Sequence, residues 1–110
     1  MTATLEKETP KTSIGEKRER YLAYSKDLMV VVIDFDDGPM EQPDEPHSHP
    51  HQQITYVAEG ELFFFINGEK TRLQAGDIMV VPPDAPHTIQ LISEHVRLVD
   101  TFSPIREDFL

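Results

Sequence analysis

The sequence predicts a single all-β domain, a barrel or sandwich of short strands. From Tyr21 onward, short apolar runs rich in β-branched and aromatic residues alternate with turn signals made of Gly, Pro, Asn and Asp. Only residues 15–24 could form a helix, because no other window has capped helical periodicity. A chain of 110 residues is the size of one compact domain. We therefore expect one domain over 14–110, preceded by a polar, flexible tail over 1–13.

The predicted strands follow from where the apolar runs begin and end. In order along the chain they are 28–35, 54–57, 62–66, 70–73, 78–81, 88–92 and 96–102. Asn67-Gly68 is a strong hairpin signal, because both central residues of a type I′ turn need a positive φ angle. We expect Phe65 and Thr71 to lie on paired strands on either side of this turn.

Two of the predicted strands are apolar on both faces. Residues 29–33 and 62–66 carry apolar side chains at odd and even positions, although a strand with one face in water should alternate. Either the N-terminal segment covers these outer faces, or two copies of the chain pack their sheets together across a two-fold axis. We favour the homodimer.

Composition excludes several classes of function. The net charge is −10 and the basic residues are scattered, so neither nucleic acid nor membrane is an expected partner. The N-terminus lacks the apolar region of a secretory signal, which makes the cytoplasm the expected location. The chain has no cysteine, so a bound metal would need histidine, carboxylate or amide oxygen ligands.

A histidine-rich segment is the strongest candidate for chemistry. His47 and His49 are two positions apart, so on a strand both imidazoles point to one face, about 6.6 Å apart along the chain. Pro50 interrupts the strand, and the chain must turn back before Gln53 can contribute to the same site. His51 shares the odd-numbered parity but need not be a ligand. The alternative is an exposed, metal-free histidine loop, and His95 is expected to be a surface residue.

A second segment, residues 76–87, supports a metal site. It contains a glycine turn, a buried strand, a proline turn and then His87, which opens the next strand. If His87 faces inward with Ile89 and Leu91, it can complete a set of ligands started by the first segment.

Together the two segments resemble the paired motifs of the cupin superfamily. His47-x-His49, then Gln53 and Gly60, match the first motif, and Gly76, Pro82 and His87 match the second. The resemblance implies a double-stranded β-helix, or jelly-roll barrel. It also implies one divalent transition metal ion (Ni, Mn, Fe, Co or Zn) bound by His47, His49, Gln53 and His87. The sequence departs from the pattern at three positions: Gln53 replaces the usual glutamate, Asp84 a glycine and Leu91 an asparagine.

The C-terminal segment narrows the resemblance. Asp100 shares a strand face with Leu98 and Phe102, which places a carboxylate among apolar neighbours. With this ending, the chain resembles the small pectin-degradation cupins of the KdgF type, which convert 4,5-unsaturated uronates to linear keto forms. The resemblance implies that Asp100, Phe102 and Arg106 belong to the active site. Gln52, where the family commonly has glutamate, and a longer loop over 38–47 are departures.

The implied roles are consistent with the chemistry of these groups. Asp100 can transfer protons, Arg106 can hold the carboxylate of a small anionic sugar, Phe102 can shape the pocket, and the metal can polarise substrate oxygens. Each has a structural alternative: Asp100 and Arg106 could form ion pairs, and Phe102 could be a core aromatic. At the level of function, the alternatives are a metal-dependent cupin acting on another small molecule, such as an oxygenase or isomerase, and a non-catalytic sugar-binding barrel.

Overall fold

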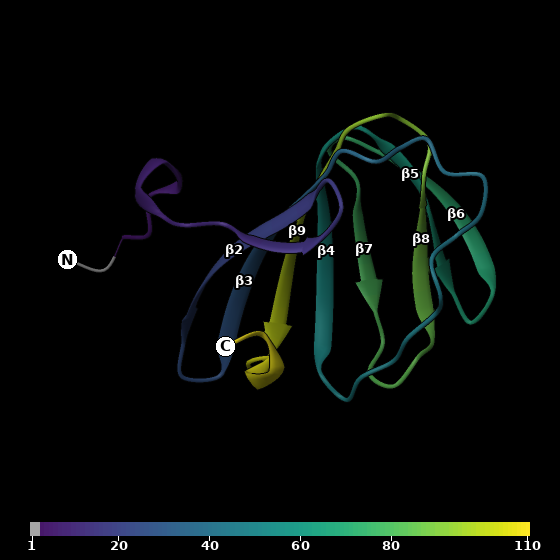
Figure 1. The fold of residues 1–110 in the computed structure, drawn as a ribbon. Coiled ribbons are helices and arrows are strands. Elements are labelled where there is room, and N and C mark those ends of the chain that lie inside the picture. Colours follow the sequence, from purple (N-terminus) through teal and green to yellow (C-terminus); the bar gives the residue numbers. More distant parts are fainter. Residues whose placement is uncertain (1–2) are drawn as a thin grey trace.

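The computed structural model describes residues 3–110 as two antiparallel β-sheets that face each other (Figure 1). In spatial order, the six-stranded sheet contains β1 (Thr12–Gly15), β2 (Arg18–Ser25), β3 (Leu28–Phe35), β9 (Val96–Ser103), β4 (Gln52–Glu59) and β7 (Ile78–Val81). The three-stranded sheet contains β6 (Glu69–Gln74), β5 (Glu61–Ile66) and β8 (His87–Leu91). Short 3-10 helices lie at Glu6–Glu8 and Glu107–Phe109. The predicted all-β barrel fold is confirmed.

Residues 15–24, the one segment that could have formed a helix, are not helical. The structure places them at the end of β1 and in β2, which pairs with β3 along its whole length. The physical reason is the two-residue alternation of this segment: Arg18, Arg20 and Leu22 lie opposite the inward-facing Phe35, Ile33 and Val31. The predicted hairpin at Asn67-Gly68 is present, with φ angles of 51° and 80°.

The hydrophobic core lies between the two sheets. β3 contributes Met29, Val31, Ile33 and Phe35, all at alternate positions, and β5 contributes Leu62 and Phe64 from the opposite sheet. The core therefore occupies part of the space between the sheets, and the pocket described below opens from it.

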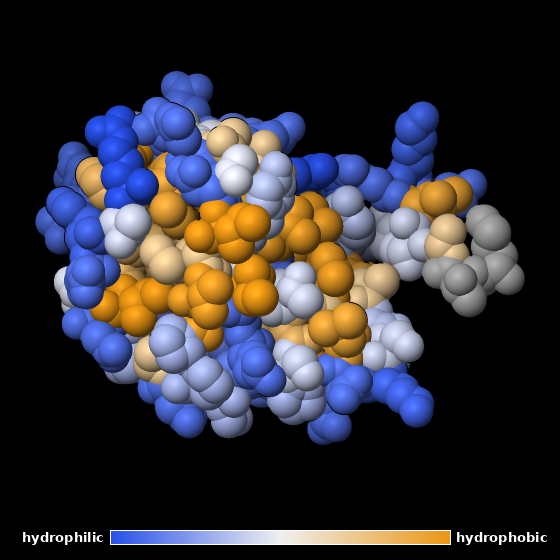
Figure 2. Space-filling model, turned by 180° about the vertical axis from the view of Figure 1, so that it is seen from behind, coloured by the Kyte–Doolittle hydropathy of each residue, from blue (hydrophilic) through white to orange (hydrophobic). Residues whose placement is uncertain are grey.

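The outer face of the six-stranded sheet carries an apolar patch. We define this outer patch as Val30, Ile54, Tyr56, Ile78 and Val80, whose side chains are between 38% and 63% exposed. Ile54 pairs with Val80 and Tyr56 with Ile78, so these four residues are contiguous. Figure 2 shows hydrophobic residues gathered in a broad area on the back of the molecule.

The two strands that were predicted to be apolar on both faces, residues 29–33 and 62–66, differ in what lies on their outer faces. The outward-facing Val30 of β3 belongs to the outer patch, whereas Phe63 of β5 is half-buried beneath Lys70, whose ammonium lies 4.3 Å from the ring centre. The first strand therefore contributes to the outer patch, and the second does not.

The N-terminal residues cover one end of the six-stranded sheet. Glu6 accepts hydrogen bonds from Arg97 at 2.8 and 3.3 Å and from Lys11 at 3.0 Å, and β1 begins at Thr12. The expected flexibility of the tail stays a prediction. Within residues 3–110, neither short helix has the length and hydropathy required to cross a membrane.

Candidate active site

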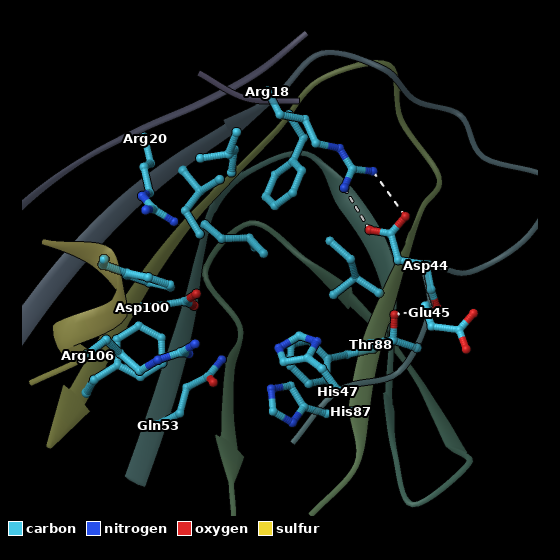
Figure 3. Close-up of a pocket in the computed structure, with 18 residues that line it drawn as sticks. Arg18, Arg20, Asp44, Glu45, His47, Gln53, His87, Thr88, Asp100 and Arg106 are labelled. Carbon is cyan, nitrogen blue, oxygen red and sulfur yellow. Dashed lines mark hydrogen bonds and ion pairs between the residues drawn. The ribbon is translucent and has the colours of Figure 1, made fainter. Parts of the chain in front are cut away.

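A cavity of about 460 Å³ lies between the two sheets. Figure 3 shows that Arg20, Asp100, Arg106 and Gln53 approach it from one side and that His47 and His87 lie across from them. The lining includes three of the four predicted metal ligands, His47, Gln53 and His87, and all three predicted catalytic residues, while the fourth ligand, His49, is buried.

Backbone pairing brings His47 and His87 together. The loop before β4 runs along the free edge of β8, and the two histidines exchange backbone hydrogen bonds of 3.0 and 2.9 Å. Their ring centres are 4.4 Å apart. With His49, they form a cluster in which one nitrogen of each ring lies within 4.8 Å of the others. The predicted convergence of these three histidines is confirmed.

The three imidazoles are in a state suited to binding a metal cation. Burial lowers the pKa of all three, that of His47 to about 4, so the rings are neutral at pH 7. His87 Nδ1 donates to the carbonyl oxygen of Ala85 at 2.8 Å, which leaves a lone pair on Nε2. That Nε2 and the Nδ1 of His49 are buried without a hydrogen-bond partner among the described residues. Buried, neutral nitrogen donors of this kind fit a divalent transition metal ion.

A chain of hydrogen bonds orients Gln53. Its amide oxygen lies 2.9 Å from His49 Nε2, and its amide nitrogen donates to the Thr55 hydroxyl at 2.9 Å. Thr55 in turn donates to Asp100 at 2.7 Å, so its oxygen is free to accept from Gln53. This arrangement directs the amide oxygen of Gln53 towards the histidines, where it can serve as the fourth ligand.

Asp100 is buried in the pocket wall beside this chain. Burial raises its pKa to about 6, although the hydrogen bond from Thr55 and the charge of Arg106 both favour the ionised form. Within residues 3–110, only one of its carboxylate oxygens accepts a side-chain hydrogen bond. A carboxyl group that titrates near neutral pH in a cavity can both accept and donate protons there.

Sequence reasoning missed Thr55, which is fully buried between Gln53 and Asp100. The signal was available in the strand alternation, because Thr55 follows Gln53 by two positions and so shares its inward face. It also lies directly opposite Asp100 in the β4–β9 register, which only the structure shows.

Phe102 and Arg106 line the pocket, but part of the Arg106 guanidinium is already hydrogen-bonded to a carboxylate of the same chain. Phe102 is buried, with its ring centre 5.7 Å from that of His49. Arg106 donates from Nε and Nη2 to Asp108, at 3.1 and 2.8 Å, and its guanidinium lies 4.3 Å from the ring centre of Phe109. The pocket therefore has an aromatic wall that includes Phe109, which no local sequence pattern indicated.

The two remaining histidines have different surroundings. His51 packs near His49, with ring centres 5.4 Å apart, but is not part of the three-histidine cluster. His95 lies outside the pocket, 2.7 Å from both Asp36 and Glu59, and these carboxylates raise its pKa. Asp34, Glu59 and His95 form a second group whose potential ligand atoms lie within 4.8 Å of one another.

Comparison with known proteins agrees with this geometry. Residues 32–102 match the cupin domain family. The chain is 37% identical to the pectin degradation protein KdgF of Dickeya dadantii, with 96% of both chains aligned. Its structure matches that of KdgF from Halomonas sp. with a TM-score of 0.87 and 33% identity, covering 96% of both chains. An RmlC-like cupin from Shewanella frigidimarina matches with the same TM-score and 36% identity, over 97% of this chain and 94% of the other. The chain therefore belongs to the cupin family and is a relative of KdgF.

Proposed function

We propose that this protein is a metal-dependent isomerase that converts 4,5-unsaturated uronates, the products of pectin or alginate breakdown, into linear keto forms. The observation that carries the proposal is the buried Asp100, joined through Thr55 and Gln53 to the histidine cluster inside the cavity. The relationship to a pectin degradation protein supports the choice of substrate class.

The reaction needs proton transfers at two places on the substrate. The ring carbon–oxygen bond of the hemiacetal breaks as its hydroxyl loses a proton, which gives an aldehyde and an enol. The enol then loses its hydroxyl proton and gains one on carbon, which gives the ketone. Atoms and electrons balance without a co-reactant. Asp100, with a pKa of about 6, can accept the first proton and return it near neutral pH.

The other pocket residues position the substrate. His47, His49, His87 and Gln53 would hold the metal, which supplies a Lewis acid for substrate oxygens when bound. Phe102 shapes the wall beside His49, and Arg106 places positive charge at the same side of the pocket as Asp100 (Figure 3).

A direct assay tests the reaction class. Freshly released 4,5-unsaturated galacturonate is mixed with the metal-loaded protein, and the loss of its conjugated ultraviolet absorbance is followed. We expect acceleration over the spontaneous reaction, and the same assay without protein is the control. An unchanged rate would reject the reaction and favour a non-catalytic sugar-binding barrel.

We also propose that the functional form is a homodimer joined through the outer patch. Several neighbouring strands supply its apolar side chains, and the N-terminal segment lies at the other end of this face, on Arg97. An apolar surface of this kind can bury itself against a second copy across a two-fold axis. We expect light scattering to give twice the 12.6 kDa chain mass and Val80→Glu to give a monomer, whereas Leu5→Glu, an equal change outside the patch, keeps the dimer. A monomeric wild-type protein at high micromolar concentration would reject this interface.

A further inference from the structure

Three arginines line the pocket, and they differ in how their charge is balanced. Arg18 is paired with Asp37 and Asp44, at 2.9 and 2.7 Å, and Arg106 is paired with Asp108. Arg20 makes no ion pair and no side-chain hydrogen bond with any residue in the described range 3–110. The chain contains 20 acidic and 10 basic residues, so an arginine without a carboxylate partner is unexpected.

The unpaired arginine faces the cavity from the six-stranded sheet. Arg20 lies on β2 opposite Ile33, and both side chains line the pocket. Burial is the main cause that lowers the pKa of Arg20; Asp108 opposes this effect and Arg106 adds to it. A partly desolvated cation with a second cation nearby is unfavourable until an anion joins it.

Aromatic stacking holds Arg20 in place. Its guanidinium lies 3.9 Å from the ring centre of Phe109, the same ring that Arg106 approaches at 4.3 Å. A guanidinium stacked on a ring keeps its N–H groups available at its edge, where they can bind both oxygens of a carboxylate. Asp108 already accepts hydrogen bonds from Nε and Nη2 of Arg106. Of these two arginines, Arg20 is therefore the one whose guanidinium N–H groups have no carboxylate partner within residues 3–110.

We propose that Arg20 is the residue that binds the carboxylate of the ligand in this pocket. That the ligand is a uronate rests on the proposed function; that it is an anion rests on the unbalanced charge of Arg20. Figure 3 shows Arg20 on the same side of the cavity as Asp100, facing the histidines, so a sugar held by Arg20 lies beside the proton-transfer group.

Two unreactive sugars test this assignment by binding alone. D-galacturonate and D-galactose differ only in that one has a carboxylate where the other has a hydroxymethyl group. The affinity of the metal-loaded protein for each is measured by calorimetry or ligand-observed NMR, for wild type, Arg20→Gln, Arg20→Lys and the control Arg72→Gln. Arg72 pairs with Glu61 on the surface, so its replacement removes the same charge outside the pocket.

We expect wild type to prefer galacturonate and Arg20→Gln to weaken that binding by about 10–100-fold, the usual worth of a charged hydrogen bond. Galactose binding should stay within about twofold, as should both affinities in Arg72→Gln. Arg20→Lys should keep part of the preference because it keeps the charge. Equal weakening of binding to both sugars would show that Arg20 only supports Phe109 and would overturn the proposal. It would also be overturned if Arg20→Gln left galacturonate binding unchanged, or if wild type bound the two sugars equally well.

The outcome is separable from that of the proposed function. If wild type binds galacturonate through Arg20 but does not accelerate the loss of absorbance of the unsaturated sugar, the proposed reaction fails and the anion site stands. If wild type accelerates that reaction and Arg20→Gln leaves its Michaelis constant unchanged, the reaction stands and the anion site is wrong.

Discussion

Within residues 3–110, two places bring three potential metal ligands within 4.8 Å of one another, and they differ in how the charges are balanced. Inside the barrel, burial lowers the pKa of His47, His49 and His87 and leaves buried nitrogens without partners. We call this the inner cluster. At the end of the sheet, Asp34, Glu59 and His95 form the outer cluster, in which oppositely charged neighbours satisfy each group.

The difference indicates that ligand type and spacing alone do not decide which of the two clusters would bind a metal ion. Arg97 donates twice to Asp34, at 2.8 and 2.9 Å, and lowers the pKa of that carboxyl group, while Glu59 and Asp36 raise the pKa of His95. A cation entering the outer cluster would have to displace these partners. In the inner cluster no such partner has to leave, so we expect one ion per chain and place it there.

The largest expected effect is the loss of the metal from the inner cluster. His87→Ala removes one of three nitrogen donors, so we expect the metal affinity to fall by more than about 100-fold and turnover to vanish. Metal analysis after gel filtration measures the stoichiometry. His95→Ala is the matched change in the outer cluster and should keep one ion per chain. Loss of the metal from His95→Ala, with retention in His87→Ala, would reverse the assignment of the two clusters.

The second effect separates catalysis from metal binding. Asp100→Asn keeps the shape of the side chain and an oxygen that can accept from Thr55, but it cannot transfer protons. We expect the turnover number to fall by about 10²–10⁴-fold while the metal content is unchanged. Asp34→Asn, an equal change in the outer cluster, should leave the turnover number near that of wild type. Full activity in Asp100→Asn would disprove the acid–base role.

The third effect is an opposite dependence of stability on pH at the two aspartates in the metal-free protein. The pKa of Asp100 is raised from 3.8 to about 6, so the stability that its protonated form contributes is lost as pH rises through that range. Asparagine does not titrate, so the free energy of unfolding of Asp100→Asn should rise relative to that of wild type, by roughly 3 kcal/mol from pH 4 to pH 7. The pKa of Asp34 is lowered, so Asp34→Asn should be less stable at pH 7, with a difference that shrinks as pH falls below 3.8. Urea unfolding from pH 7 down to below pH 3.8 measures both differences, and a common sign would refute the comparison.

The smallest effect concerns His95. Because its pKa is raised, protonation of His95 adds stability that is complete below its ordinary value of 6.5 and is lost as pH rises through the raised value. His95→Gln should therefore be less stable than wild type at pH 6, by about 1 kcal/mol or less for a partly exposed pair, and equal to it near pH 9. Thermal melts at the two pH values test this, and a deficit that persists at pH 9 would mean that packing, not charge, is responsible.

Local patterns predicted most of the strands and the histidine cluster. β3 and β7 have the predicted boundaries because turn residues close both ends of each apolar run. The three histidines were predictable from the two motifs, whereas the expectation that His47 and His49 share a strand was wrong, because both lie in the loop before β4 and only His47 forms a single bridge, with His87. β2 was not predicted because its inward face carries Arg18 and Arg20, and its stability comes from pairing with β3.

The remaining site residues could not be predicted because their roles depend on distant contacts. Thr55 meets Asp100 through the register of two strands that are far apart in sequence. Arg20 meets Phe109 only because the last turn of the chain folds against β2. No window of neighbouring residues contains either relation, so periodicity and turn signals carry no information about them.

The placement of the proposed metal ligands on both sheets has a consequence for the lifetime of the protein. Gln53 belongs to β4 of the large sheet, and His87 belongs to β8 of the small one. An ion bound to both residues would link the two sheets across the open side of the barrel. Because the unfolded chain lacks this site, the ion would stabilise the folded chain by mass action, more so at higher occupancy. The melting temperature would then report the supply of metal, and a cell short of that metal would lose the protein to unfolding and proteolysis.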